Sequence, residues 1–253
     1  MKTNRTSTKT DWGSVADWYD GVVEGDNSYQ KNVIEPNLLR MMGDIKNKKV
    51  LDIACGQGYF SNLMSLSGAE VTGFDLGADL IKIAKEKNKK VNFQVLNAEN
   101  FAENIKDKFD IAVCVLALQN IENAKKVLEN AKKILNTNGR FIIILNHPTF
   151  RIPRSSSWQN DNDIQYRRVD AYMSESKIKM DMNPGSKSNK EYTYSYHRPL
   201  QYYFKLFSNT GFAVTRLEEW ISHKESQDGP RKAVEDKARH EFPMFMCIEL
   251  TAQ

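Results

Sequence analysis

The sequence predicts an α/β fold: a doubly wound, mostly parallel seven-stranded sheet with an antiparallel last strand, an N-terminal helical cap and an insertion after strand five. Between residues 47 and 146, short β-rich runs alternate with helical stretches, which is typical of parallel strands joined by crossover helices. Two runs, 111–116 and 141–145, are apolar at every position, as expected for central strands covered on both faces. The five runs in this part are VLDIA, EVTGF, VNFQVL, FDIAVCVLAL and RFIIILN.

The chain before residue 47 is expected to hold a tail and a cap. Residues 1–13 are rich in Thr, Lys and Asn and are expected to be a flexible tail, followed by one domain over 14–253. Within 14–46, apolar side chains recur at helical spacing from Val33 to Met42, and Pro36 suits a helix start. We therefore expect a helical cap over the core that 47–146 forms.

The stretches between the core strands predict three helices, over 59–67, 78–88 and 123–135. The last of them is followed by NTNG at 136–139, which indicates a helix stop and a turn before the next strand.

Residues 147–197 are rich in Arg, Ser, Asn and Tyr and predict an insertion, with only a weak helical period from 164 to 173. A helix is then expected from Pro199 to Asn209, followed by strands at 213–222 and 242–250, so that 198–253 forms a C-terminal helix and strand pair. The polar connection 227–241 is too short for a typical crossover. The last two strands are therefore expected to be antiparallel.

Composition narrows the class of protein. The chain has 36 Lys and Arg against 32 Asp and Glu, and its net charge of +4 does not identify a nucleic-acid binder. Cys55, Cys114 and Cys247 lie far apart without a CxxC pair, so neither a disulfide framework nor a metal site is suggested. No signal peptide is recognisable, and no apolar run approaches the roughly 18 residues of a membrane span. We expect a soluble, cytoplasmic protein.

A glycine turn marks the candidate site. The run VLDIA leads directly into Cys55, Gly56, Gln57 and Gly58 and then into a helix, so the glycines lie at the carboxyl end of the sheet, where ligands of open α/β sheets bind. Glycine allows the backbone to approach a ligand closely. The GxG pattern alone is weak, and an ordinary tight turn explains it equally well.

A carboxylate follows the next strand. Asp75 ends the run EVTGFD, where it can accept hydrogen bonds from both hydroxyls of a ribose, and its spacing from Gly56 fits a nucleoside cofactor. A helix N-cap is the alternative role for Asp75. After the third strand, Asn97 and Glu99 could accept from an adenine amino group, although a simple turn is equally consistent.

The segments VLDIACGQGYF, VTGFD, NAE and FDIAVCVLALQNI resemble the successive motifs of class I S-adenosylmethionine-dependent methyltransferases, the broad group with ubiquinone-biosynthesis and small-molecule enzymes. The resemblance covers residues 15–150 well and 195–250 loosely. It implies S-adenosyl-L-methionine as the cofactor, with the glycines near its methionine part and the strand-end residues on its ribose and adenine. The implied cofactor-binding residues are Asp52, Ala54, Gly56, Gly58, Asp75, Leu76, Asn97, Ala98 and Leu116.

Two positions depart from the family pattern. Asn97 stands where relatives usually have Asp, and Gln119 and Asn120 stand where many have a His pair, so no catalytic base is assigned there. We expect a small-molecule acceptor, with its O, N or C atom undetermined, under a cover formed by 147–197. The candidate substrate-binding residues are Gln119, Arg151, Trp158, Tyr172 and Arg198, and the candidate catalytic residues are His147 and His197, although a lone His is more often structural.

Three other functions are weighed against this one. A nucleic-acid methyltransferase is disfavoured because no DPPY-like motif follows the fourth strand and Cys114 lies within a predicted strand. A nicotinamide-dependent oxidoreductase is disfavoured because Ser61 replaces the third fingerprint glycine. A catalytically silent protein that only binds S-adenosylmethionine stays open, as does the oligomeric state.

Overall fold

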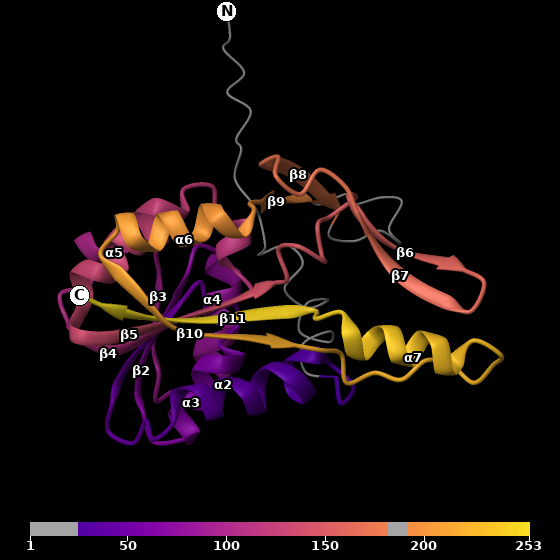
Figure 1. Ribbon diagram of the computed structural model, residues 1–253. Coiled ribbons are helices and arrows are strands. Elements are labelled where there is room, and N and C mark those ends of the chain that lie inside the picture. Colours follow the sequence, from indigo (N-terminus) through magenta and orange to yellow (C-terminus); the bar gives the residue numbers. More distant parts are fainter. Residues whose placement is uncertain (1–24, 182–191) are drawn as a thin grey trace, which may run out of the picture.

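The computed structural model describes residues 25–181 and 192–253, and its centre is a seven-stranded sheet of order β10-β11-β5-β4-β1-β2-β3 (Figure 1). The last strand, β11, is antiparallel to both β5 and β10, whereas the other neighbouring strands are parallel. The predicted fold class is confirmed. The strands are β1 (Lys49–Ile53), β2 (Glu70–Asp75), β3 (Asn92–Val95), β4 (Phe109–Val115), β5 (Leu135–Asn146), β10 (Phe212–Trp220) and β11 (Phe245–Ala252).

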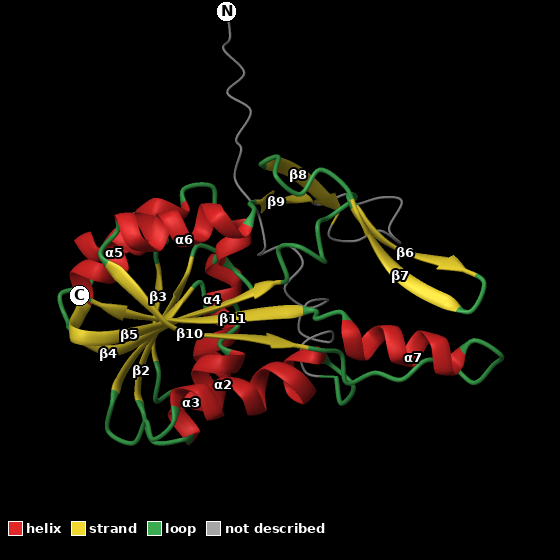
Figure 2. Ribbon diagram, viewed as in Figure 1, coloured by secondary structure: helices red, strands yellow, loops and turns green. Residues whose placement is uncertain are grey.

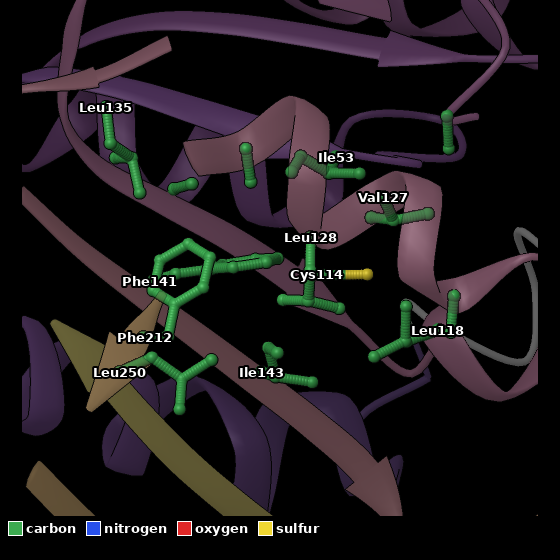
Figure 3. Close-up of a cluster of buried hydrophobic side chains, with 14 of the residues drawn as sticks. Ile53, Cys114, Leu118, Val127, Leu128, Leu135, Phe141, Ile143, Phe212 and Leu250 are labelled. Atoms are coloured by element: carbon green, nitrogen blue, oxygen red, sulfur yellow. The ribbon is translucent and has the colours of Figure 1, made fainter. Parts of the chain in front are cut away.

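Helices cover both faces of this sheet (Figure 2). Because side chains alternate along a strand, each central strand contributes to two cores. One core packs under α5 (Ala124–Ile134) and α6 (Leu200–Asn209), and Figure 3 shows Phe141, Ile143 and Cys114 within it. The other core packs under α2 (Glu35–Met42), α3 (Tyr59–Leu66) and α4 (Ala78–Lys87). Both faces of the central strands are therefore buried, as their apolar runs predict.

The N-terminal cap is described from residue 25 onward, so the predicted tail 1–13 and the start of the cap lie outside the described residues. A π-helical turn, η2 (Gln30–Ile34), runs into α2, which has Pro36 in its first turn. Arg140 donates to the carbonyl of Met41 at 3.2 Å and ties the end of α2 to β5. No described helix is long and apolar enough to cross a membrane.

The insertion after β5 consists of two antiparallel strand pairs, where the sequence suggested only a weak helical period. They are β6 (Ser156–Asp161) with β7 (Ile164–Val169), and β8 (Ser176–Asp181) with β9 (Tyr192–His197). Along β7, exposed and half-buried positions alternate, which is the period of a strand and not of a helix. Residues 182–191 lie outside the described ranges.

Two further elements differ from the expectation. The NTNG segment belongs to β5, whose pairing with β4 shifts register between Phe109 and Ile111, so the extra residues are absorbed as an irregularity within the strand. The connection between the last strands contains a helix, α7 (Lys232–Glu241). Only Ala238 of α7 is buried, so its apolar periodicity is too weak to indicate a helix from the sequence.

Candidate active site

A cavity of about 420 Å³ opens at the carboxyl ends of β1, β2, β3 and β4. Short helices and turns follow these strands: η3 (Phe101–Glu103) comes after β3, and η4 (Leu118–Asn120) after β4. The segments that line the cavity are the turn after β1, the start of α4, the segment 96–99, the segment 115–122 and Tyr196 of β9. The cavity therefore lies where the topology of an open parallel sheet places its ligand.

The turn after β1 approaches the cavity with an unusual backbone. Ala54 and Gly56 have φ values of 57° and 56°, in the left-handed region, and both line the cavity. Gly58, with a φ of 82°, does not line it. A Cβ on Gly58 would lie 2.7 Å from the ring of Phe93, so this glycine allows α3 to start close against β3. Gly58 is therefore needed for the packing of the turn against β3 and not for contact with the cavity.

The carboxylate of Asp75 is anchored by two backbone groups. Its Oδ2 accepts from the N–H of Gly56 and its Oδ1 from the N–H of Gly77, each at 2.9 Å. Burial raises the pKa of Asp75, and these hydrogen bonds oppose the rise. Since an ionised carboxylate has about four acceptor sites, two remain for the hydroxyls of a ribose.

Asp52 lies at the bottom of the cavity and is almost fully buried. Its Oδ2 accepts from the hydroxyl of Ser61 at 2.6 Å. Burial raises the pKa of Asp52 to about 7; the Ser61 hydrogen bond opposes this, and the charge of Asp75 adds to it. A cationic ligand group nearby would favour the ionised form.

The charge of the lining distinguishes between cofactors. It contains the carboxylates of Asp52, Asp75, Glu99 and Glu122, and no Lys, Arg or His among the described residues that form it. Such a lining suits the sulfonium and ammonium groups of S-adenosylmethionine and opposes the pyrophosphate of a nicotinamide cofactor. The residues present therefore fit S-adenosylmethionine.

The residues that follow β2, β3 and β4 form the rest of the expected cofactor site, including the part expected to bind adenine. Leu76 is 48% exposed and lines the cavity together with buried Ala98. Asn97 also lines it, but its Oδ1 accepts from the N–H of Glu99 at 2.9 Å and so stabilises the turn. Leu116 has a φ of 52° and also lines the cavity. Of the nine residues expected to bind cofactor, only Gly58 is absent from the lining.

The cavity contains residues that the sequence analysis missed. Gln57 is 2% exposed, and neither atom of its amide has a hydrogen-bond partner within the described part of the chain. Its place inside the CGQG turn was the available signal. Gln30 and Phe60 also line the cavity, but they come from separate elements that only the folded chain brings together. Tyr196 lines it as well and belongs to the insertion that was expected to form the cover.

The two candidate catalytic histidines lie outside this lining. His147 is buried, and its Nε2 lies 2.6 Å from a carboxylate oxygen of Glu219, while its Nδ1 accepts from the N–H of Phe150 at 3.3 Å. The Nε2 of His197 lies 2.7 Å from the carbonyl oxygen of Tyr172. The two rings do not converge on the cavity. Both nitrogens of His147 are occupied, which leaves none to accept a proton from a substrate.

Arg198 and Gln119 do not line the cavity but form hydrogen bonds with the segment after β4 that does. The guanidinium of Arg198 is buried and donates to the carbonyls of Ile121 and Glu122 at 2.9 and 2.6 Å. It also lies over the rings of Tyr196 and Tyr202, at 5.1 and 5.2 Å. The amide of Gln119 donates to the carbonyl of Leu116 at 2.7 Å. These residues hold the lining segment after β4 in position.

The remaining substrate candidates also lie outside the lining. Trp158 packs edge-on against Phe242, with ring centroids 5.4 Å apart. The hydroxyl of Tyr172 accepts from the N–H of Leu200 at 3.0 Å and helps to fix the start of α6. Arg151 lies over the ring of Phe245, at 5.8 Å.

The sheet, the glycine turn and the acidic cavity together define a class I S-adenosylmethionine-dependent methyltransferase.

Comparison with protein families supports this class. A family described as a methyltransferase domain matches residues 44–196, and the chain belongs to it. Ubiquinone biosynthesis O-methyltransferase of Pseudomonas syringae pv. tomato is 28% identical over 127 residues, which are 49% of this chain and 55% of the relative. The protein of that name from Hydrogenovibrio crunogenus is 28% identical over 115 residues, 44% of this chain and 48% of the relative. The chain thus spans about half the length of these curated relatives.

Solved structures share the fold. An S-adenosylmethionine-dependent methyltransferase from Mesorhizobium loti has a TM-score of 0.70 at 21% identity, over 87% of this chain and 99% of the other. The magnesium protoporphyrin IX methyltransferase of Synechocystis PCC 6803, solved with bound SAH, has a TM-score of 0.59 at 14% identity, over 95% and 94% of the two chains. Both structures therefore show that this chain has the fold of S-adenosylmethionine-dependent methyltransferases.

Proposed function

We propose that this chain transfers the methyl group of S-adenosylmethionine to a small-molecule acceptor. The observation that carries the proposal is the acidic cavity at the carboxyl edge of the sheet, which is walled on the insertion side by Tyr196. A methyl donor in this cavity would lie beside β9 of the insertion. The names of the curated relatives refer to ubiquinone biosynthesis, which supports a small-molecule acceptor.

The cofactor-binding roles follow from the geometry above. Asp75 would hold the ribose hydroxyls, Leu76 and Ala98 would contact adenine, and the backbone of the turn at Gly56 would lie against the methionine part. Asp52 would place a negative charge near the ammonium group. When bound, S-adenosylmethionine supplies a methyl group on a positively charged sulfur.

The protein's own contribution would be alignment and the exclusion of water, because displacement from a sulfonium has a neutral leaving group. The described parts of the insertion, 147–181 and 192–197, would cover the acceptor, and Arg198 would couple that cover to the lining after β4. His147 and His197 would support the cover without moving a proton. No residue of the lining needs to act as a base unless the acceptor atom arrives protonated.

A methyl-transfer assay tests this function. The purified protein is incubated with S-adenosylmethionine labelled on its methyl group and with a filtered metabolite extract, and in parallel with total RNA and with DNA. We expect label in a small-molecule product, and loss of that label with Asp75→Ala. Labelled nucleic acid would overturn the proposed acceptor class, and retention of the cofactor without any transfer would favour a binding protein.

A further inference from the structure

Arg151 is a half-buried cation for which the described residues supply no acceptor. Its guanidinium forms no hydrogen bond or ion pair with any described residue and lies over the ring of Phe245. Burial lowers the pKa of Arg151, and the charge of Arg167 adds to this, but a guanidinium stays charged in proteins. A charge removed from water without a partner is costly. This cost is offset when an anion binds.

Arg167 shows the contrast. Its Nε donates to the carbonyl of Phe150 at 2.7 Å, and its Nη2 donates to the hydroxyl of Ser156 at 2.9 Å. It also lies 5.1 Å over the ring of Trp158. Arg167 therefore stabilises the insertion, whereas the donors of Arg151 meet no acceptor in 25–181 or 192–253.

The surroundings of Arg151 suit an anion with an apolar body. Tyr29 packs edge-on against Phe245, with ring centroids 5.7 Å apart, and Lys224 places its Nζ 4.7 Å from the centroid of the Tyr29 ring. The ammonium of Lys224 also lacks a hydrogen bond or ion pair among the residues that the structure describes. Arg151, Phe245, Tyr29 and Lys224 are thus linked by successive ring contacts.

This place lies at the same edge of the sheet as the cofactor cavity. Phe245 begins β11 and pairs with Asn146 at the carboxyl end of β5, and β5 lies beside β4, which leads into cavity-lining Leu116. Strands are about 4.8 Å apart, so two steps across the sheet amount to about 10 Å. Gln30, which follows Tyr29, also lines the cavity. A small molecule can span this distance.

We propose that Arg151 binds an anionic oxyacid group of the methyl acceptor, a carboxylate or a phosphate monoester. The planar guanidinium matches two oxygens of either group, and the rings of Phe245 and Tyr29 contact the apolar part of the molecule. The proposal rests on the proposed function, since it names the chemical class of that acceptor.

Calorimetry with three probes tests it on the full chain loaded with S-adenosylhomocysteine. We expect benzoate or phenyl phosphate to bind saturably, and neutral benzamide to bind at least tenfold more weakly than the better anion; the tighter anion identifies the oxyacid group. Arg151→Met should weaken that anion at least tenfold, and Arg151→Lys should weaken it less. Arg168→Met is the matched control, because Arg168 is an exposed arginine of the insertion paired with Asp170 at 3.0 Å.

Three results would overturn the inference: no saturable binding of either anion, equal affinities for benzamide and the anions, or an unchanged anion affinity in Arg151→Met. The comparison of benzamide with the anions uses the wild-type chain and so holds even if a variant fails to fold. The affinity for S-adenosylhomocysteine is measured separately on each protein. If the wild-type chain does not bind S-adenosylhomocysteine, the proposed function is wrong. If it binds S-adenosylhomocysteine but does not prefer the anions over benzamide, only this inference is wrong.

Discussion

Asp75 and Gly56 are joined by a hydrogen bond of 2.9 Å from the glycine N–H to the carboxylate. It links the end of β2 to the turn after β1, so the group that would bind the ribose also fixes the backbone that would contact the methionine part. Two regions of the cofactor site are therefore coupled through one side chain.

Replacing Asp75 by Ala should lower the affinity for S-adenosylhomocysteine at least tenfold. The change removes the acceptor for the ribose, and charge-assisted hydrogen bonds of this kind contribute about 1.5–3 kcal/mol each. Titration calorimetry measures the dissociation constant, with Asp79→Ala, an exposed carboxylate of α4, as the control. An unchanged constant in Asp75→Ala would remove Asp75 from the site.

Gln57→Leu should change stability and binding in opposite directions. The buried amide of Gln57 has no hydrogen-bond partner within the described residues. Its removal should therefore increase the free energy of unfolding of the ligand-free protein by about 1–3 kcal/mol, which raises the melting temperature. If the amide contacts the cofactor, the same change weakens cofactor binding. Differential scanning fluorimetry with and without S-adenosylhomocysteine measures both, and Gln201→Leu on the exposed face of α6 is the control. A rise in stability with full affinity would make Gln57 a packing residue.

Arg198→Met should destabilise the protein by about 3 kcal/mol, because buried carbonyls lose a charged donor. The segment around Ile121 and Glu122 should then exchange its amide hydrogens faster, and cofactor affinity should fall with it. Arg198→Lys should keep the positive charge but only part of the affinity for the cofactor, because an ammonium group lacks the planar arrangement of donors by which the guanidinium reaches several carbonyls. Wild-type exchange rates at this segment in Arg198→Met would contradict the positioning role.

The stability of the fold should depend on pH through His147. Burial lowers the pKa of His147 more than Glu219 raises it, so the folded protein favours the neutral ring. This contribution to stability is full above the unfolded pKa of about 6.5 and is lost as the pH falls through the lower folded value. The urea midpoint should therefore drop from pH 7.5 to pH 5.5, and the drop should be smaller in His147→Ala.

His240→Ala, at an exposed position of α7, should keep the wild-type drop in the urea midpoint and serves as the control. The pH profile of methyl transfer should keep its shape in His147→Ala if the ring is structural. Loss of an alkaline-rising limb in that variant alone would reinstate His147 as a base.

The sequence predicts those parts of the site that depend on local order. The glycine turn and Asp75 directly follow strands, and parallel strands bring their carboxyl ends together, so both positions could be read from the chain. The roles of His147 and Arg198 could not. His147 interacts with Glu219, 72 residues away, and Arg198 with Glu122, 76 residues away, and no local pattern encodes such pairs.

The same distinction holds for the fold. Strong apolar runs predict the central strands, whereas α7 buries a single side chain and shows no clear period. The strand pairs of the insertion are largely half-buried or exposed, so their sequence lacks the contrast that identifies strands of a core.

The acidic lining of the cavity also bears on the exchange of the spent cofactor for a fresh donor. The donor carries a sulfonium charge that is absent from its demethylated product, so the carboxylates of Asp52 and Asp75 attract the donor more strongly than the product. Each transfer would thus weaken the electrostatic attraction between the lining and the spent molecule.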